Sequence, residues 1–191
     1  EVTASLAVYN DSTGCRDTLS KVIKFASIDS FRYTLTPQKG CAPLKVLMSA
    51  PSDTGVFNYI WELGNGDRGF GNNYVATYPA EGQFVVKMFV RYNNGCLIAS
   101  SQRDTVTVIK AHADFNFDKA SGCVPAVFNF RDSSYSNSSP IVSYSWLFNN
   151  TATASGQTAS YGFNALGTYS VKLTVQNQEG CRDSLTKTVT V

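Results

Sequence analysis

An internal repeat with a spacing of 85 residues constrains the fold of this chain more than any other feature. Residues 59–63 read Tyr-Ile-Trp-Glu-Leu and residues 144–148 read Tyr-Ser-Trp-Leu-Phe, and each segment holds one of the two tryptophans. The same spacing links Cys96 to Cys181. Self-similarity at a fixed period indicates a tandem array of one structural unit. The 191 residues are therefore expected to hold two complete modules, each large enough for its own core.

Apolar and polar residues alternate along both modules, which we place at residues 29–110 and 111–191. Residues 84–90 carry an apolar side chain at every second position, and residues 171–175 repeat that pattern. Alternation with period two is typical of strands with one buried face, and no segment has a convincing helical period. Short strands separated by frequent turn signals predict an all-β fold of tandem antiparallel β-sandwiches.

Residues 1–28 look like a fragment of a third module. Residues 2–8 alternate as a strand, a turn follows around Gly14, and residues 15–19 read Cys-Arg-Asp-Thr-Leu. Residues 181–185 read Cys-Arg-Asp-Ser-Leu near the end of the last module. We therefore expect residues 1–28 to form the C-terminal hairpin of a preceding module whose front half is missing.

Five cysteines follow the repeat. Each complete module has one Gly-Cys-x-Pro near its start and one Gly-Cys in a turn near its end, and no Cys-x-x-Cys pair suggests zinc. We predict the disulfides Cys41–Cys96 and Cys123–Cys181, each worth about 4 kcal/mol through the loop-closure entropy it removes. Cys15 is predicted to be unpaired, because its partner would lie in the missing half of its own module. Disulfides indicate an exported protein.

Charge and hydropathy exclude several classes of partner. The net charge is only +2, from 16 Lys and Arg against 14 Asp and Glu, and no basic block suggests nucleic acid. No apolar run approaches the ~20 residues of a membrane span, so no membrane insertion is expected. We interpret the chain as a piece of a longer secreted protein that lies outside the cell, at its surface.

No set of residues predicts catalysis. His112 is the only histidine and falls at the junction between the modules. A general base must be held against a nucleophile, and a junction residue is a poor candidate for that role. We therefore expect no enzyme activity and no cofactor.

The tryptophans are predicted core residues. Trp61 and Trp146 each share a strand face with a tyrosine and an apolar residue, which favours burial over stacking on a sugar. Exposed aromatics such as Phe70, Tyr74 and Tyr135 are better candidates for ligand contacts.

Two segments resemble the PKD (polycystic kidney disease) domain family. Residues 61–67 read Trp-Glu-Leu-Gly-Asn-Gly-Asp and resemble the Trp-Asp-Phe-Gly-Asp-Gly signature of that family. Residues 167–175 match its Gly-x-Tyr-x-Val-x-Leu-x-Val element, whereas residues 146–151 depart from the signature because the Gly-Asp-Gly turn is gone. The resemblance implies immunoglobulin-like sandwiches, an extracellular location and no catalysis.

The cysteine motifs resemble those of long surface adhesins of gliding Bacteroidetes-type bacteria. This resemblance implies a non-enzymatic stalk, with an extracellular protein or polysaccharide surface and neighbouring modules as partners. The alternative is a spacer or carbohydrate-binding accessory array in a secreted hydrolase or protease.

Two kinds of modification or ligand follow from the same resemblances. Some PKD modules hold calcium near their ends, for which Asp29, Asp53 and Asp67 are candidates, although turn chemistry accounts for the last two without a metal. The triplets that begin at Asp17, Asp104 and Asp183 resemble O-glycosylation sites of such bacteria. An ordinary polar–apolar strand pattern produces the same triplets.

Overall fold

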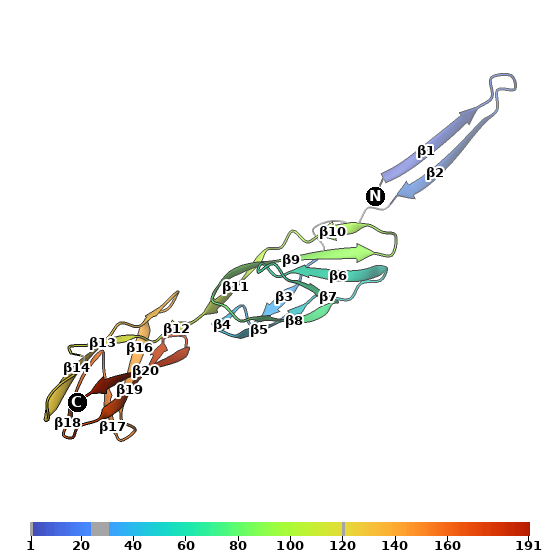
Figure 1. The fold of residues 1–191 in the computed structure, drawn as a ribbon. Helices are drawn as coiled ribbons and strands as arrows, with labels where there is room; N and C mark the ends of the chain where they lie inside the picture. The colour runs from blue at the N-terminus through green and yellow to red at the C-terminus, as the bar shows by residue number, and fades with distance from the viewer. Residues whose placement is uncertain (1, 24–30, 120) are drawn as a thin grey trace.

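The computed structural model describes residues 2–23, 31–119 and 121–191, which contain twenty strands and no helix (Figure 1). None of these residues forms an apolar helix long enough to cross a membrane. The predicted all-β fold of tandem immunoglobulin-like sandwiches is confirmed. The expected boundary at residues 28 and 29 lies outside the described residues.

The first two strands form an isolated antiparallel hairpin, drawn in blue in Figure 1. β1 (Val2–Tyr9) pairs with β2 (Arg16–Ile23), and Leu6 lies opposite Leu19. Every residue from 2 to 23 is exposed, so nothing described covers either face of this hairpin.

Module 1, from Phe31 to Lys110, is a sandwich of two sheets. The smaller sheet has the order β3-β5-β8 and the larger has the order β4-β11-β9-β6-β7, with β10 also paired to β9. The strands of the smaller sheet are β3 (Thr34–Thr36), β5 (Leu44–Ser49) and β8 (Asn73–Tyr78). Those of the larger sheet are β4 (Lys39–Cys41), β6 (Val56–Glu62), β7 (Arg68–Phe70), β9 (Gly82–Tyr92), β10 (Leu97–Ala99) and β11 (Asp104–Ile109).

Module 2, from Ala111 onward, repeats this plan. One sheet has the order β13-β14-β18, the other has the order β17-β16-β19-β20, and β12 pairs separately with β15. The strands are β12 (Ala111–His112), β13 (Phe115–Phe117), β14 (Ala126–Asp132), β15 (Tyr135–Ser136), β16 (Ile141–Phe148), β17 (Ala152–Ser155), β18 (Thr158–Phe163), β19 (Thr168–Asn177) and β20 (Arg182–Thr190).

Each module has its own core, built from the inward positions of the alternating strands. In β9 the buried residues are Val86, Met88 and Val90, and their neighbours in the strand face outward. The core of module 1 runs from Phe31 to Val108 and that of module 2 from Ala111 to Val189. Only a short link therefore separates the two cores along the chain.

The tryptophans occupy the same place in the two cores. Trp61 and Trp146 are both fully buried. Trp61 packs edge-on against Tyr33, with ring centroids 5.3 Å apart, and Trp146 packs in the same way against Phe115 at 5.1 Å. Aromatic side chains at the centre of a sandwich bury a large apolar area and prefer such edge-to-face contacts.

Candidate functional site at the module junction

A disulfide joins the two modules. Cys41, in β4 of module 1, is bonded to Cys181, in the turn between β19 and β20 of module 2, with Cα atoms 5.3 Å apart. Cys15, Cys96 and Cys123 are free and exposed. The predicted pairs Cys41–Cys96 and Cys123–Cys181 are therefore wrong, because the bond runs between modules and not within them.

The ends of the long strand β9 explain this correction. β9 starts at Gly82, next to Glu81, which contacts His112 of module 2. It then runs for 11 residues, roughly 35 Å, before the turn that carries Cys96. Cys41 lies at the module 2 end of this strand, and a disulfide needs Cα atoms within about 7 Å. Cys41 and Cys96 are thus at opposite ends of one sandwich and cannot meet.

The link itself is held in place by hydrogen bonds from module 2. β12 forms directly after Lys110 and pairs with β15, so the two modules are joined without a flexible spacer. The amide of Asn137 donates to the carbonyl of Val108 at 3.3 Å, and its side-chain oxygen accepts from the backbone N–H of Lys110 at 3.2 Å. The Ser136 hydroxyl donates to the carbonyl of Lys110 at 2.9 Å.

Charged and aromatic side chains reinforce the junction. His112 Nε2 lies 3.0 Å from Glu81 Oε1, and the His112 ring stacks on Tyr135 with centroids 4.6 Å apart. On the side of the disulfide, Lys39 Nζ of module 1 lies 2.5 Å from Glu179 Oε1 of module 2. The Lys39–Glu179 pair is solvent-exposed, and such pairs contribute little stability individually. We therefore assign these contacts to orientation of the modules.

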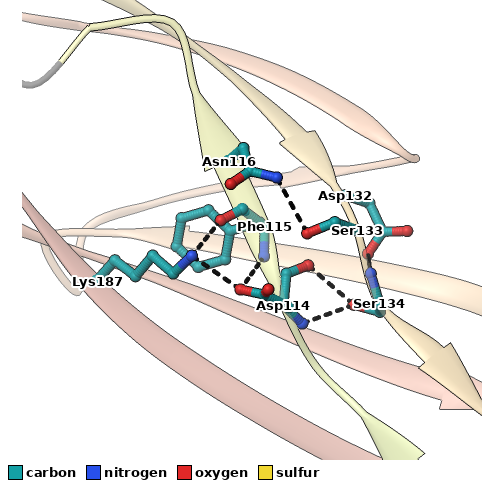
Figure 2. Close-up of polar contacts among 7 residues, drawn as sticks. All are labelled: Asp114, Phe115, Asn116, Asp132, Ser133, Ser134 and Lys187. Atoms are coloured by element: carbon teal, nitrogen blue, oxygen red, sulfur yellow. Dashed lines mark hydrogen bonds and ion pairs between the residues drawn. The ribbon is translucent and has the colours of Figure 1, made fainter.

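A polar cluster ties the start of β13 to β20, the last strand of module 2, as Figure 2 shows. The Lys187 ammonium donates to Asp114 Oδ1 at 2.8 Å and to the carbonyl of Phe115. The hydrogen bond from Lys187 lowers the pKa of the Asp114 carboxyl, and the N–H of Phe115 adds to this effect against the opposing effect of burial. On the other side, Ser134 Oγ donates to the Asp114 carbonyl at 3.1 Å. The cluster fixes the chain just after the junction.

Comparison with protein families decides what these modules are. The family described as the PKD domain matches residues 33–108 and 112–191. The chain belongs to the PKD domain family. The matched residues consist only of PKD domains, which are not catalytic domains.

Solved structures similar to this chain include PKD domains and other modular proteins. The PKD1 domain of the Vibrio cholerae metalloprotease PrtV is 27% identical over 43% of this chain and 96% of its own, with a TM-score of 0.39. The PKD1 domain of Vibrio anguillarum Epp is 26% identical over 43% of this chain and 93% of its own, also with a TM-score of 0.39. A structure from a 1.5-MDa bacterial ice-binding adhesin is 13% identical over 84% of this chain and 63% of its own, with a TM-score of 0.37.

The aromatic residues proposed as ligand contacts lie at separate places and differ in their exposure. Phe70 is exposed on β7 of the first PKD module, whereas Tyr74 is half-buried against Gly69. Tyr135 is exposed at the junction, where it stacks on His112. The structure does not bring these three rings together, and Tyr135 belongs to the joint.

The aspartates proposed as calcium ligands are not gathered either. Asp53 accepts a hydrogen bond from the Tyr92 hydroxyl, and Asp67 accepts one from the Asn65 amide within its own turn. Asp29 lies outside the described residues. Among residues 2–23, 31–119 and 121–191, no group of three or more His, Cys, Asp or Glu side chains could hold a metal ion.

The three hydroxyl residues of the possible glycosylation triplets are accessible. Thr18, Thr105 and Ser184 are all exposed on strands. Their modification stays a prediction.

An open depression lies on the outer face of the β13–β14–β18 sheet. The polar side chains that line it include Asn116, Asp118, Asn129 and Arg131. Asp118 accepts hydrogen bonds from the backbone and the amide of Asn129, and these bonds lower the pKa of its carboxyl. Sequence patterns did not indicate this surface.

Proposed function

We propose that this chain is a non-enzymatic stalk segment of a long extracellular cell-surface adhesin. One observation carries the proposal: the two PKD modules are joined end to end by a disulfide and a two-residue strand. A spacer that only separates two domains works with a flexible linker, and inter-domain motion is the usual expectation. A junction fixed by a disulfide and a strand instead holds each module in a set orientation relative to its neighbour.

An extracellular location is supported by the disulfide. Disulfides persist in oxidising compartments and are rare where glutathione and thioredoxin keep thiols reduced. Cys181 is almost completely buried in the joint and Cys41 is half-buried, so the bond is partly shielded once it has formed.

We place the chain, more narrowly, among the surface adhesins of gliding Bacteroidetes-type bacteria. The repeated Gly-Cys-x-Pro and Gly-Cys-Arg-Asp motifs support this placement. The partners would then be an extracellular protein or polysaccharide surface and the neighbouring modules of the same chain.

The second candidate is a spacer or carbohydrate-binding array of a secreted hydrolase or protease. The depression on β13–β14–β18 favours it, because the amide, carboxylate and guanidinium groups in its lining are of the kinds that hydrogen-bond to sugars. Against it, the two tryptophans are buried, and Tyr135 is already stacked on His112.

Small-angle X-ray scattering tests the stalk directly. The oxidised chain should have one narrow, extended distribution of dimensions. A Cys41→Ser, Cys181→Ser double variant should broaden this distribution toward bent forms, and the matched Cys96→Ser, Cys123→Ser variant should leave it unchanged. Equal, broad distributions for all three proteins would refute a stiff joint.

Polysaccharide binding separates the two candidates. The alternative predicts retention of the chain on an insoluble polysaccharide and loss of retention in an Asn129→Ala, Arg131→Ala variant. The stalk predicts no retention by either protein.

A further inference from the structure

The Gly-Cys turn has the same geometry in both PKD modules. In module 1 the N–H of Tyr92 donates to the carbonyl of Cys96 at 2.9 Å, and in module 2 the N–H of Asn177 donates to the carbonyl of Cys181 at 3.0 Å. The glycines before the two cysteines have φ values of 86° and 85°. Cys96 is therefore presented as Cys181 is, yet Cys96 is exposed and free whereas Cys181 is bonded.

The Gly-Cys-x-Pro segment is also built in the same way in both modules. In module 1, Lys39 pairs in parallel with Thr107 of the last strand, two residues before Cys41. In module 2, Ser121 pairs in parallel with Thr190, two residues before Cys123. Cys123 thus occupies the place of Cys41, but it is exposed and free.

The two free cysteines lie at opposite ends of the two-module unit. We define the leading end of a module as the end with the Gly-Cys turn, and the trailing end as the end with Gly-Cys-x-Pro. Cys96 lies at the leading end of module 1, away from module 2, and Cys123 lies at the trailing end of module 2, away from module 1. Each is one half of the site whose complete form is Cys41–Cys181.

We propose that these two ends are docking surfaces for further PKD modules, joined by the same disulfide. Cys123 bonds to the Gly-Cys turn of the module that follows, and Cys96 bonds to the Gly-Cys-x-Pro of the module that precedes. Cys15, on the same type of turn, takes its partner from one module further upstream. The result is a staggered series of disulfides in which every module is bonded to both neighbours.

Each bond forms by oxidation of two thiols. The cysteines lose two protons and two electrons, and a small-molecule disulfide accepts them and leaves as two thiols. This inference goes beyond the proposed function, because it holds equally for a stalk and for an array in a secreted hydrolase.

A three-module chain tests the docking surface at Cys123. Val191 pairs with Gly167 through both backbone hydrogen bonds, as Val108 pairs with Gly82, so Val191 is the equivalent of Val108. A second copy of residues 109–191 is appended after Val191. In this copy Cys123→Ser removes the duplicate thiol, and Gln178→Ala at an exposed position gives the peptide that contains the copied Cys181 a distinct mass.

The chain is refolded with a mixture of reduced and oxidised glutathione and mapped without reduction. The expected result is near-complete linkage of Cys123 to the mass-tagged peptide, together with the original Cys41–Cys181 bond. The matched variant, with Cys181→Ser in the appended copy only, should leave Cys123 fully alkylatable. Amide exchange of the tagged peptide reports whether the appended module is folded.

Three outcomes would overturn the proposal. One is an appended module with protected amides beside a Cys123 that stays a thiol. Another is an appended module without protected amides. The end of module 2 would then fail to support a following module, although the equivalent end of module 1 supports module 2. The third comes from the unextended chain: native alkylation should label Cys15, Cys96 and Cys123, and recovery of a Cys41–Cys96 or Cys123–Cys181 pair would remove the basis of the inference.

Discussion

Single residues fix the core of each module through both packing and hydrogen bonding. The Trp146 indole N–H donates to the carbonyl of Gly156 at 2.9 Å, and the Trp61 indole N–H donates to that of Gly71 at 2.8 Å. Each ring therefore satisfies its polar atom by binding the backbone just beyond the strand that follows it. This double constraint explains why tryptophan and its surroundings recur at the spacing of the repeat.

Replacing Trp146 with alanine should unfold module 2 selectively. Removal of a large buried aromatic costs about 3–5 kcal/mol. Hydrogen exchange in urea should show early loss of protection in β19, with β9 of module 1 little affected. Val142→Ala is the matched control, because Val142 lies on the same strand and is 58% exposed; its effect should stay within about 0.5 kcal/mol. Equal protection of β19 in the Trp146→Ala variant would contradict the assignment of this residue to the core.

Asp114 should make module 2 sensitive to acid. Its pKa is lowered in the folded state by the hydrogen bond from Lys187, so the stabilising effect is present above the unfolded pKa, near 4. It is lost as the pH falls through the folded value. Because the Asp114 side chain is half exposed, we expect less than about 1 kcal/mol. Asp114→Asn should flatten the fall of the urea midpoint between pH 6 and pH 3, and Asp11→Asn in the exposed hairpin should not.

At the level of elements, the strands were predictable because their pattern is local. Alternation of apolar residues in residues 84–90 and 171–175 reflects a physical constraint within a single strand, that successive side chains face opposite sides. The turn around Gly95 and Gly180 is equally local, since both glycines adopt a positive φ that other residues rarely accept.

The disulfide was not predictable because it depends on which ends of two sandwiches meet. Each module has one Gly-Cys-x-Pro cysteine and one Gly-Cys turn cysteine. These can pair within a module or between neighbouring modules, and both schemes use the same number of cysteines, so the sequence does not distinguish them. Only the length of β9, which separates Cys41 from Cys96, decides between them. Asn137 and Glu81 also act across the junction, and neither belongs to a motif that sequence could have indicated.

The N-terminal hairpin should be the least stable element of the chain. A two-stranded hairpin is marginal in water without a covering layer, and both faces of β1 and β2 are exposed. Hydrogen exchange should replace the amides of residues 2–23 within seconds while β9 and β19 stay protected. Strong protection of β1 in a monomeric chain would show that the hairpin needs no further sheet. Coverage of Val2, Leu6 and Val8 by the remainder of their own module stays a prediction.

At the scale of the whole molecule, the joint determines the behaviour of the array. In a chain of sandwiches on flexible links, the orientation of each module is independent of its neighbour. In a chain whose modules are fixed to one another, each module sets the orientation of the next. The Cys41–Cys181 bond and the Lys39–Glu179 pair hold one side of the link, and β12, paired with β15, holds the linking segment itself. Two modules held at several points cannot hinge about any one of them.

The disulfide should also protect the part of each module that lies between the two cysteines from mechanical load. When the chain is pulled from its ends, force passes from Cys41 directly to Cys181 and leaves the intervening polypeptide unloaded. The sequence separation of the two cysteines is 140, so roughly 490 Å of extended chain is withheld.

Single-molecule force spectroscopy can measure this withheld length. The oxidised chain should extend only through the segments outside residues 41–181, and addition of a thiol reductant should release the withheld length in two unfolding events, one for each core. A Cys41→Ser variant should show both events without reductant, and a Cys96→Ser, Cys123→Ser variant should behave as the unaltered chain. Full extension of the oxidised chain would show that the covalent path does not run through the joint, and the array would then have to resist force through the strands of each module alone.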